Sequence, residues 1–256
     1  MINLAKTSIK DPGLDSKEAI LRKQYMKDLF KTQARNYDFH DDIYGFYAHR
    51  LWILSLLGVI NKFMNSKKSA KMLDLACGTG FVTFNVAKRY RNIDISGFDI
   101  SPHTIEVARE RRHKKFKNRK ISFYLGDAEL PYGDNKYDII TTSFAFRNFA
   151  NKNLAVENVF RALKPGGVFI IQDLTKPEHQ PLKGIYLFYM KYILPIFTTI
   201  LGTERTVAAW LYKSVMMMPI NSAIKNLLED KGFEDVFCKK QMLGIACLIG
   251  GYKPKE

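Results

Sequence analysis

An apolar run followed by a glycine turn is the feature that most constrains this sequence. In Lys71-Met-Leu-Asp-Leu-Ala-Cys-Gly-Thr-Gly-Phe81, apolar residues flank Asp74 on both sides, and two glycines, Gly78 and Gly80, follow closely. The run predicts a buried strand, and the glycines let a ligand approach the backbone because they carry no Cβ. A helix expected from Phe81 would point its first N–H groups at the same ligand. The segment therefore predicts a nucleotide-type cofactor site.

The spacing of the glycines differs from that of dinucleotide-binding proteins. Their fingerprint has a third glycine three residues after the second, and Thr83 occupies that position here. The turn alone thus leaves the identity of the cofactor open.

Strand-like and helix-like segments alternate from about residue 70 to 175. This alternation is typical of a parallel sheet with crossover helices. Ser101-Pro102 supplies an N-cap and a first-turn proline for one helix, and Lys164-Pro-Gly-Gly167 ends another. The expected strands are 71–77, 94–100, 120–127, 137–144, 168–174, 233–242 and 245–252. We therefore predict an α/β, Rossmann-like fold with a mostly parallel seven-stranded sheet, in which the last two strands, joined through Gly244, form an antiparallel hairpin.

Two regions lie outside the alternation. Residues 1–70 are expected to be mostly helical and to form a lid on the core over 71–256. Residues 176–219 are expected to be a helical insertion after the fifth strand, with an apolar and aromatic stretch that Lys191 and Pro195 interrupt. Because a membrane span needs about 20 apolar residues, this stretch fits a lid over an apolar substrate or a face on lipid better. An ordinary core helix is the alternative.

The charge balance indicates an anionic partner. The 256 residues carry a formal net charge of +15, which favours either nucleic acid or the negative face of a membrane. The densest basic run, 109–120, contains a single aromatic residue, Phe116, and therefore offers little stacking surface for bases. We expect a peripheral contact with an anionic membrane surface and no contact with nucleic acid.

The cysteines and the N-terminal residues indicate the compartment. Cys77, Cys238 and Cys247 have no metal-type spacing, so we expect small buried residues and no metal site. The absence of a disulfide framework favours a reducing compartment. The first residues lack both the apolar core of a signal peptide and the acid-free composition of a transit peptide. A cytoplasmic protein at the inner face of a membrane is expected.

Three acidic residues fall at expected strand ends, where open α/β sheets bind ligands. Asp99 ends the second strand and can accept hydrogen bonds from both hydroxyls of a ribose. Asp127 ends the third and can accept from an exocyclic adenine amine, while the N–H of Ala128 donates to a ring nitrogen. Asp74 would face an ammonium group and would repel the pyrophosphate of NAD. Ribose, adenine and ammonium together describe S-adenosylmethionine.

The motifs also resemble those of a known family. The order Asp-Leu-Ala-Cys-Gly-Thr-Gly, Phe98-Asp-Ile100, Gly126-Asp-Ala128 and Leu163-Lys-Pro-Gly-Gly167 resembles the class I methyltransferases. Within them, the chain is similar to the ubiquinone/menaquinone C-methyltransferase family from about residue 25 to 253. The narrower resemblance rests on Tyr37-Asp38, His49-Arg-Leu-Trp52, Thr142-Ser-Phe-Ala-Phe-Arg-Asn148, the Pro195 segment, Met218-Pro219 and Gly251-Tyr-Lys253.

The resemblance implies a class I methyltransferase fold and C-methylation of a polyprenyl benzoquinol or naphthoquinol ring. It implies Arg147 and Asn148 as the catalytic pair next to the reacting ring. Phe144-Ala-Phe-Arg147 departs from the family's Phe-Gly-Leu-Arg, and this departure concerns the acceptor more than the cofactor. The residues predicted to bind S-adenosylmethionine are Asp74, Gly78, Thr79, Gly80, Asp99, Ile100, Asp127, Ala128 and Ser143.

Such a reaction depends on geometry and charge, because the methyl group of a sulfonium is already a strong electrophile. The ring becomes more nucleophilic when a phenolic hydroxyl loses its proton, so the site must stabilise and align a phenolate. Arg147 suits this task because its guanidinium stays charged, and Asn148 would orient a water molecule or a ring oxygen. His49 and Asp38 are candidate proton acceptors, although a lone histidine is more often structural.

Other functions stay open. A small-molecule O- or N-methyltransferase with a non-quinone acceptor would share the cofactor site. An RNA methyltransferase would explain the basic charge, but Ser143-Phe-Ala-Phe146 replaces the Asn/Asp-Pro-Pro-Tyr type of motif. A non-catalytic binding or scaffold protein would have no use for Asp74, Asp99 and Asp127 together. Whether the chain forms a homodimer is also open.

Overall fold

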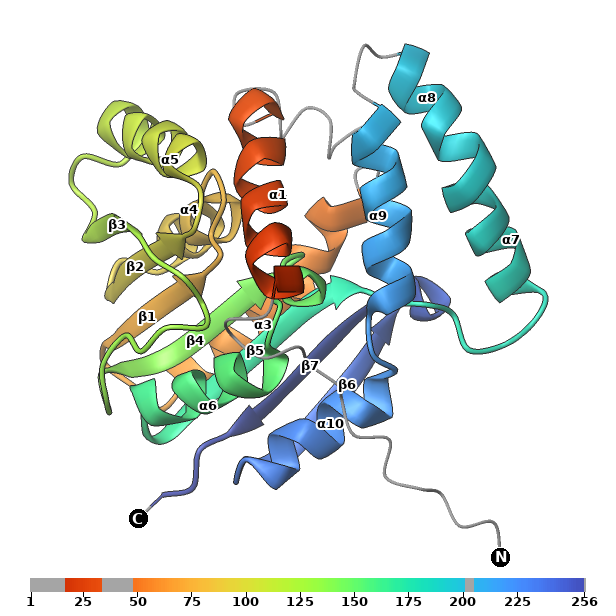
Figure 1. Cartoon of the computed structure of the whole chain (residues 1–256). Helices are drawn as coiled ribbons and strands as arrows, with labels where there is room; N and C mark the ends of the chain where they lie inside the picture. Colours follow the sequence, from red (N-terminus) through yellow and green to blue (C-terminus); the bar gives the residue numbers. More distant parts are fainter. Residues whose placement is uncertain (1–16, 34–47, 201–204, 256) are drawn as a thin grey trace, which may run out of the picture.

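The chain forms a seven-stranded sheet covered by helices (Figure 1). The structure is a computed structural model that describes residues 17–33, 48–200 and 205–255. The strands are β1 (Ala70–Leu75), β2 (Ile93–Asp99), β3 (Ile121–Leu125), β4 (Tyr137–Ser143), β5 (Leu163–Leu174), β6 (Glu234–Gln241) and β7 (Ala246–Tyr252). Their order is β3-β2-β1-β4-β5-β7-β6, with β1 to β5 parallel and β7 antiparallel to β5 and β6. The predicted mostly parallel sheet with its antiparallel hairpin is confirmed.

Crossover helices follow β1, β2 and β4, and local signals start two of these helices. The helices are α4 (Phe81–Arg89), α5 (Pro102–Lys115) and α6 (Lys152–Ala162), with α10 (Asn221–Asp230) before the hairpin. The side chain of Ser101 caps α5, with Pro102 in its first turn, and the side chain of Asn151 caps α6. Because β1 to β5 run in one direction, their carboxyl ends meet at one edge of the sheet.

The strand β5 begins at Leu163, whereas we predicted from the sequence that it begins at Val168. Leu163 already pairs with Tyr137 of β4, and the register then shifts. Gly166 has a φ of +71°, and its N–H donates to the carbonyl oxygen of Lys253 at 3.0 Å. The prediction was wrong here because a glycine at positive φ lets the strand bulge and stay paired.

Side chains that alternate along the strands divide the core into two clusters. Met72 and Ile139 pack on one face with α4, α5 and α3 (Ala48–Met64). Leu73 and Ile140 pack on the other face with α6 and α10. Since both faces are covered, the central strands consist of nearly continuous apolar runs. The helix α3 belongs to this core packing, so residues 48–64 do more than cover the site.

Further helices stand at the carboxyl edge of the sheet (Figure 1). One is α1 (Lys17–Gln33), which stands between α5 and α9. The insertion after β5 contains α7 (Leu182–Phe188), a π-helical turn (Tyr189–Ile193), α8 (Leu194–Ile200) and α9 (Arg205–Met217). The π-helical turn joins α7 to α8 and ends two residues before Pro195, which lies in the first turn of α8 and has no N–H to donate. The apolar stretch is therefore one continuous helical arm rather than two broken pieces.

Candidate functional site

A cavity opens beside α1 at the carboxyl ends of the central strands. It encloses about 1180 Å³, including the solvent at its mouth. The predicted site residues that line it are Asp74, Gly78, Thr79, Asp99, Ile100, Asp127, Ala128, Ser143 and Asn148. Gly80 and Arg147 are not among the lining residues. The fold thus gathers most of the predicted residues on one cavity wall.

The glycine turn presents Gly78, and not Gly80, to the cavity. Gly78 has a φ of +55°, and a Cβ at this position would meet no atom within 4 Å. Gly80 has a φ of +89°, and a Cβ there would lie 2.6 Å from the ring of Phe84. The sequence led us to expect that both glycines admit a ligand. Gly80 instead serves the turn itself and the packing at the start of α4.

Asp74 is almost fully buried at the end of β1, where it ties this strand to α4. Its Oδ2 accepts hydrogen bonds from the backbone N–H and the hydroxyl of Thr83 at 3.0 and 2.6 Å. Its Oδ1 accepts from the hydroxyl of Thr141 at 3.2 Å. Burial raises the pKa of Asp74 to about 6, although these hydrogen bonds oppose the shift. A neighbouring ammonium group would favour the ionised form.

Asp99 holds the glycine turn against β2. Its Oδ2 accepts from the N–H of Gly78 at 2.8 Å, and its Oδ1 accepts from the N–H of Ser101 at 2.8 Å and the hydroxyl of Thr104 at 3.0 Å. Burial raises the pKa of Asp99 above its usual value, and the backbone hydrogen bonds oppose that shift. Each oxygen of a carboxylate can accept more than one hydrogen bond. The carboxylate therefore keeps capacity for a ligand hydroxyl in the cavity.

Ser143 and Asn148 bring polar groups to the cavity after β4. The hydroxyl oxygen of Ser143 is buried and has no hydrogen-bond partner within the described part of the chain. Buried polar atoms normally find a partner, so this oxygen is a natural ligand contact. Asn148 lies in a 3-10 turn (Phe146–Asn148), and its Oδ1 accepts from the indole N–H of Trp210 in α9 at 3.2 Å. Trp210 of the insertion thus holds Asn148 in the cavity wall.

Arg147 lies behind the wall in a buried ion pair. Its Nη1 contacts Asp173 Oδ1 of β5 and donates to the carbonyl oxygen of Phe144. Its Nε donates to the hydroxyl of Ser214 in α9 at 3.2 Å, and its backbone N–H donates to Asp173 Oδ2 at 2.9 Å. The structure therefore separates Arg147 from its neighbour Asn148, which faces the cavity. The role of Arg147 next to the ring stays a prediction.

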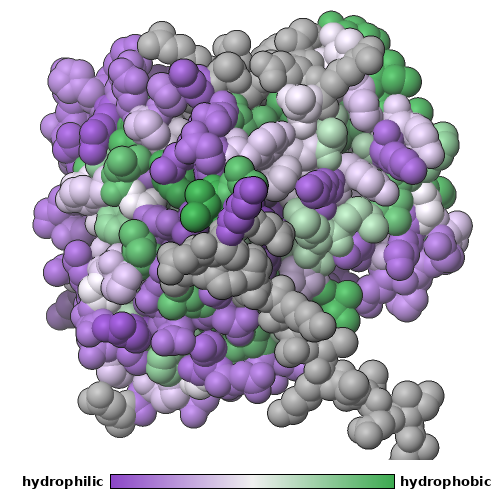
Figure 2. Space-filling model, in the orientation of Figure 1, coloured by the Kyte–Doolittle hydropathy of each residue, from purple (hydrophilic) through white to green (hydrophobic). Residues whose placement is uncertain are grey.

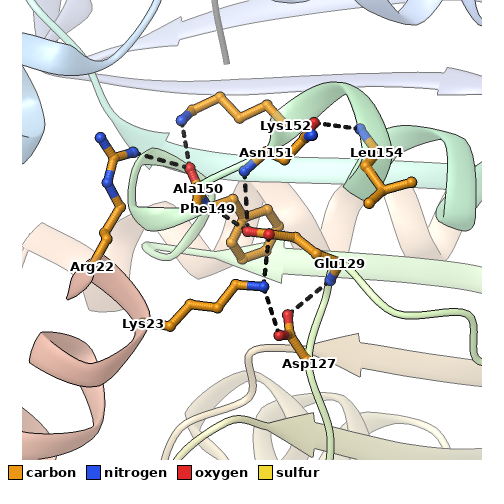
Figure 3. A network of polar contacts seen from close by, with 9 residues as sticks. All are labelled: Arg22, Lys23, Asp127, Glu129, Phe149, Ala150, Asn151, Lys152 and Leu154. Carbon is orange, nitrogen blue, oxygen red and sulfur yellow. Dashed lines mark hydrogen bonds and ion pairs between the residues drawn. The ribbon is translucent and has the colours of Figure 1, made fainter. Parts of the chain in front are cut away.

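A charged network lies at the end of the cavity where β3 stops (Figure 3). Lys23 of α1 lies 2.8 Å from Asp127 Oδ2 and 2.8 Å from Glu129 Oε2. The backbone N–H of Glu129 donates to Asp127 Oδ1 at 2.9 Å. Sequence reasoning missed Lys23, Met26 and Glu129, which all line the cavity. Glu129 follows Asp127 closely in sequence, but no local signal links α1 to this site.

The candidate proton acceptors cannot be placed at the site. Tyr37 and Asp38 lie outside the described residues, and of His49 only the backbone, in α3, is described. Their part in the reaction stays a prediction. Within the described ranges, no group of three or more histidine, cysteine, aspartate or glutamate side chains could hold a metal ion.

Comparison with known proteins identifies relatives across nearly the whole chain. Residues 18–253 match the ubiE/COQ5 methyltransferase family. The chain is 32% identical over 246 residues to ubiquinone/menaquinone biosynthesis C-methyltransferase UbiE of Shewanella pealeana, covering 94% of this chain and 95% of that protein. It is 30% identical over 236 residues to demethylmenaquinone methyltransferase of Staphylococcus aureus, covering 91% of this chain and 95% of the relative.

Solved structures share the fold at lower identity. A putative S-adenosyl-L-methionine-dependent methyltransferase of Methanococcus maripaludis has a TM-score of 0.56 at 17% identity, covering 96% of this chain and 99% of that one. Phosphoethanolamine N-methyltransferase 2 of Haemonchus contortus, solved with S-adenosyl-L-methionine, has a TM-score of 0.58 at 15% identity, covering 78% of this chain and 52% of that one. The Rossmann-like class I methyltransferase fold is thereby confirmed.

Proposed function

The chain belongs to the ubiE/COQ5 methyltransferase family, and on this premise we propose that it transfers the methyl group of S-adenosylmethionine to a ring carbon of a polyprenyl benzoquinol or naphthoquinol. The observation that carries the proposal is the single cavity that gathers Asp74, Asp99 and Asp127 with Asn148. The relatives named for ubiquinone/menaquinone and demethylmenaquinone methylation support a quinol-type acceptor.

The residues of the cavity fit the cofactor. Asp99 would accept from the ribose hydroxyls, Asp127 and the N–H of Ala128 would hold the adenine, and Asp74 would favour the ammonium group. The unpartnered hydroxyl of Ser143 and the open space over Gly78 support a ligand at this wall. When bound, the cofactor supplies an electrophilic methyl group, so no nucleophile from the protein is required.

The cavity also has apolar lining residues, which would suit a quinol ring. Met26, Phe144 and Phe149 are among them. Asn148 would orient a ring oxygen or a water molecule through its amide. Arg147 fixes the carbonyl of Phe144 and the turn that carries Asn148, and its positive charge lies directly behind them. We expect these residues to align and stabilise a phenolate.

The proposal predicts methylation of a lipid. Purified protein incubated with isotope-labelled S-adenosylmethionine and a membrane lipid extract should place the label on a ring carbon of a prenylated quinol. Label on oxygen or nitrogen of another small molecule would support the rival methyltransferases instead. Label only in nucleic acid would refute the quinol assignment, and a failure to bind the cofactor in calorimetry would support the scaffold alternative.

We also propose that the insertion docks on a membrane, where a polyprenyl quinol would be found. The inner face of the arm packs on α9 through Tyr186, Met190 and Leu194. Its outer face exposes large apolar side chains, and green atoms are visible along the upper right edge of the molecule (Figure 2). The exposed side chains are Ile185, Phe188, Tyr192, Ile196, Phe197 and Ile200. Because helices of soluble proteins normally turn polar residues outward, an apolar outer face indicates a partner.

Charge favours an anionic lipid surface as that partner. The arm over 182–200 contains Lys183 and Lys191 and no acidic residue, and the chain carries +15 overall. An amphipathic element of this kind binds by burying apolar side chains while cations attract anionic lipids. None of the described helices is long and apolar enough to cross a membrane.

The variant Phe188→Ser/Ile196→Ser should therefore lose binding to vesicles that contain anionic lipid. Both side chains are more than half exposed, so the fold should survive. Flotation of the vesicles should recover the unchanged protein and the matched control Leu243→Ser, whose side chain is exposed in the hairpin. Equal flotation of all three proteins, or no binding by any, would refute docking through the arm.

A further inference from the structure

Two carboxylates share one cation at the end of β3. Asp127 and Glu129 are two residues apart, and both line the cavity. Lys23, which is 104 residues from Asp127 in sequence, reaches them from α1 and lies 2.8 Å from each (Figure 3). The opposite side of Glu129 is engaged as well, because Oε1 accepts from the N–H of Ala150 at 2.7 Å and of Asn151 at 3.1 Å.

The cation is needed because the carboxylates are poorly solvated. The side chain of Glu129 is 3% exposed and that of Asp127 is 18% exposed. Buried negative charge is costly unless it is paired, and like charges in close contact repel. Burial lowers the pKa of Lys23, but the hydrogen bonds and charges of Asp127 and Glu129 outweigh burial and raise it. Lys23 is therefore held as a cation between the two.

The position of Lys23 is fixed by its neighbours on α1. Arg22 donates to the carbonyl oxygen of Phe149 at 3.3 Å and contacts the sulfur of Met217 in α9 at 3.8 Å. The ring of Tyr25 packs against Trp210 of α9 with centroids 4.6 Å apart. Contacts of residues before and after Lys23 therefore hold α1 in place, and Lys23 extends from this helix into the cavity wall.

We propose that Lys23 is a positioning residue of the cofactor site, which neutralises the Asp127–Glu129 pair and so keeps Asp127 oriented to accept from the adenine amine of the methyl donor. Asp127 uses one oxygen for the N–H of Glu129 and the other for Lys23. An oxygen of a carboxylate accepts two hydrogen bonds, so the ligand contact and Lys23 are compatible. The inference rests on the proposed function, since it requires that adenine binds at Asp127.

The test is calorimetric titration of the full chain with S-adenosylhomocysteine. Lys23→Met should weaken binding by at least about 10-fold, because it leaves two carboxylates in the wall without their cation. Lys23→Arg should keep affinity near that of the unchanged protein, since it retains the charge and donor groups. Lys27→Met is the matched control, because Lys27 lies one turn further along α1 and is exposed. Its affinity should stay unchanged.

A compensating variant separates charge from simple anchoring of α1. Glu129→Gln removes one negative charge, yet its side-chain oxygen can still accept from Ala150 and Asn151. Lys23→Met/Glu129→Gln should therefore regain most of the lost affinity. If the double variant binds as weakly as Lys23→Met, Lys23 only anchors α1 and the inference is overturned, as it is if Lys23→Met binds normally. If the unchanged protein does not bind the ligand, the proposed function itself fails.

Discussion

Arg147→Ala should strongly reduce methyl transfer, with kcat falling by about 10²–10³-fold, while the affinity for S-adenosylmethionine stays close to that of the unchanged protein. The guanidinium donates to the carbonyl oxygen of Phe144, directly before the turn that carries Asn148, and we propose that its charge also stabilises the phenolate of the acceptor. It does not line the cavity, so the cofactor contacts stay intact. Turnover of a quinol and calorimetric titration of the cofactor measure the two effects separately.

The same change should also destabilise the protein. Asp173 is 1% exposed, and Arg147→Ala removes its cation. Loss of one partner of a buried ion pair lowers the free energy of unfolding by about 3–5 kcal/mol. Urea unfolding followed by circular dichroism should show this decrease, and activity must be measured at a temperature at which the variant is folded.

A charge-balanced variant separates the two roles of Arg147. In Arg147→Met/Asp173→Asn the buried negative charge is gone, and the asparagine oxygen can still accept a backbone N–H. We expect the free energy of unfolding to recover in part while kcat stays low, because the positive charge near the acceptor is still missing. If kcat recovers together with stability, Arg147 serves only to pair Asp173, and its place in the mechanism is wrong.

The fold could be predicted because its signals are local. Ser101 caps the helix that begins directly after it, as predicted, and the apolar run around Asp74 defines a central strand wherever it lies in the sheet. The site residues at the ends of β1, β2 and β3 follow from this, since parallel strands bring their carboxyl ends together. Thr83 marks the limit of such reasoning. In the sequence, Thr83 showed only that the third glycine of the dinucleotide-binding fingerprint is missing. In the structure, its hydroxyl donates a hydrogen bond to Asp74.

The remaining features depend on contacts that the sequence does not encode locally. Lys23 reaches Asp127 across 104 residues, and no spacing rule connects the two. The family resemblance implied that Arg147 and Asn148 both lie next to the reacting ring. In a 3-10 turn, consecutive side chains project about 120° apart, so one residue enters the core and the other faces the cavity.

The two helical covers of the site meet through aromatic side chains. Tyr25 of α1 packs against Trp210 of α9, and the indole N–H of Trp210 donates to Asn148. The helix that carries Lys23, at the proposed cofactor end of the cavity, therefore contacts the helix that holds Asn148, at the proposed acceptor end. Because α9 also packs on the apolar arm, the proposed membrane contact, the acceptor site and the cofactor site would share one set of packed helices.

Asp99→Ala should lower the affinity for S-adenosylmethionine by about 100-fold or more, because hydrogen bonds to a charged group contribute about 1.5–3 kcal/mol each. The change removes the acceptor expected for the ribose and leaves the N–H of Gly78, which lines the cavity, without its present partner. The glycine turn then loses one of its hydrogen bonds to β2, while the bond from the N–H of Cys77 to the carbonyl oxygen of Phe98 remains. Calorimetric titration with S-adenosylmethionine measures the loss.

Ser101→Ala is the control for general damage at this corner of the fold. It removes the cap of α5 and should lower the free energy of unfolding by about 1 kcal/mol, but it leaves the Asp99 carboxylate and its bond to Gly78 in place. The affinity for the cofactor should then stay within about two-fold of the original value. If Ser101→Ala weakens binding as much as Asp99→Ala does, Asp99 acts through the stability of α5, and a direct contact with the ribose is contradicted.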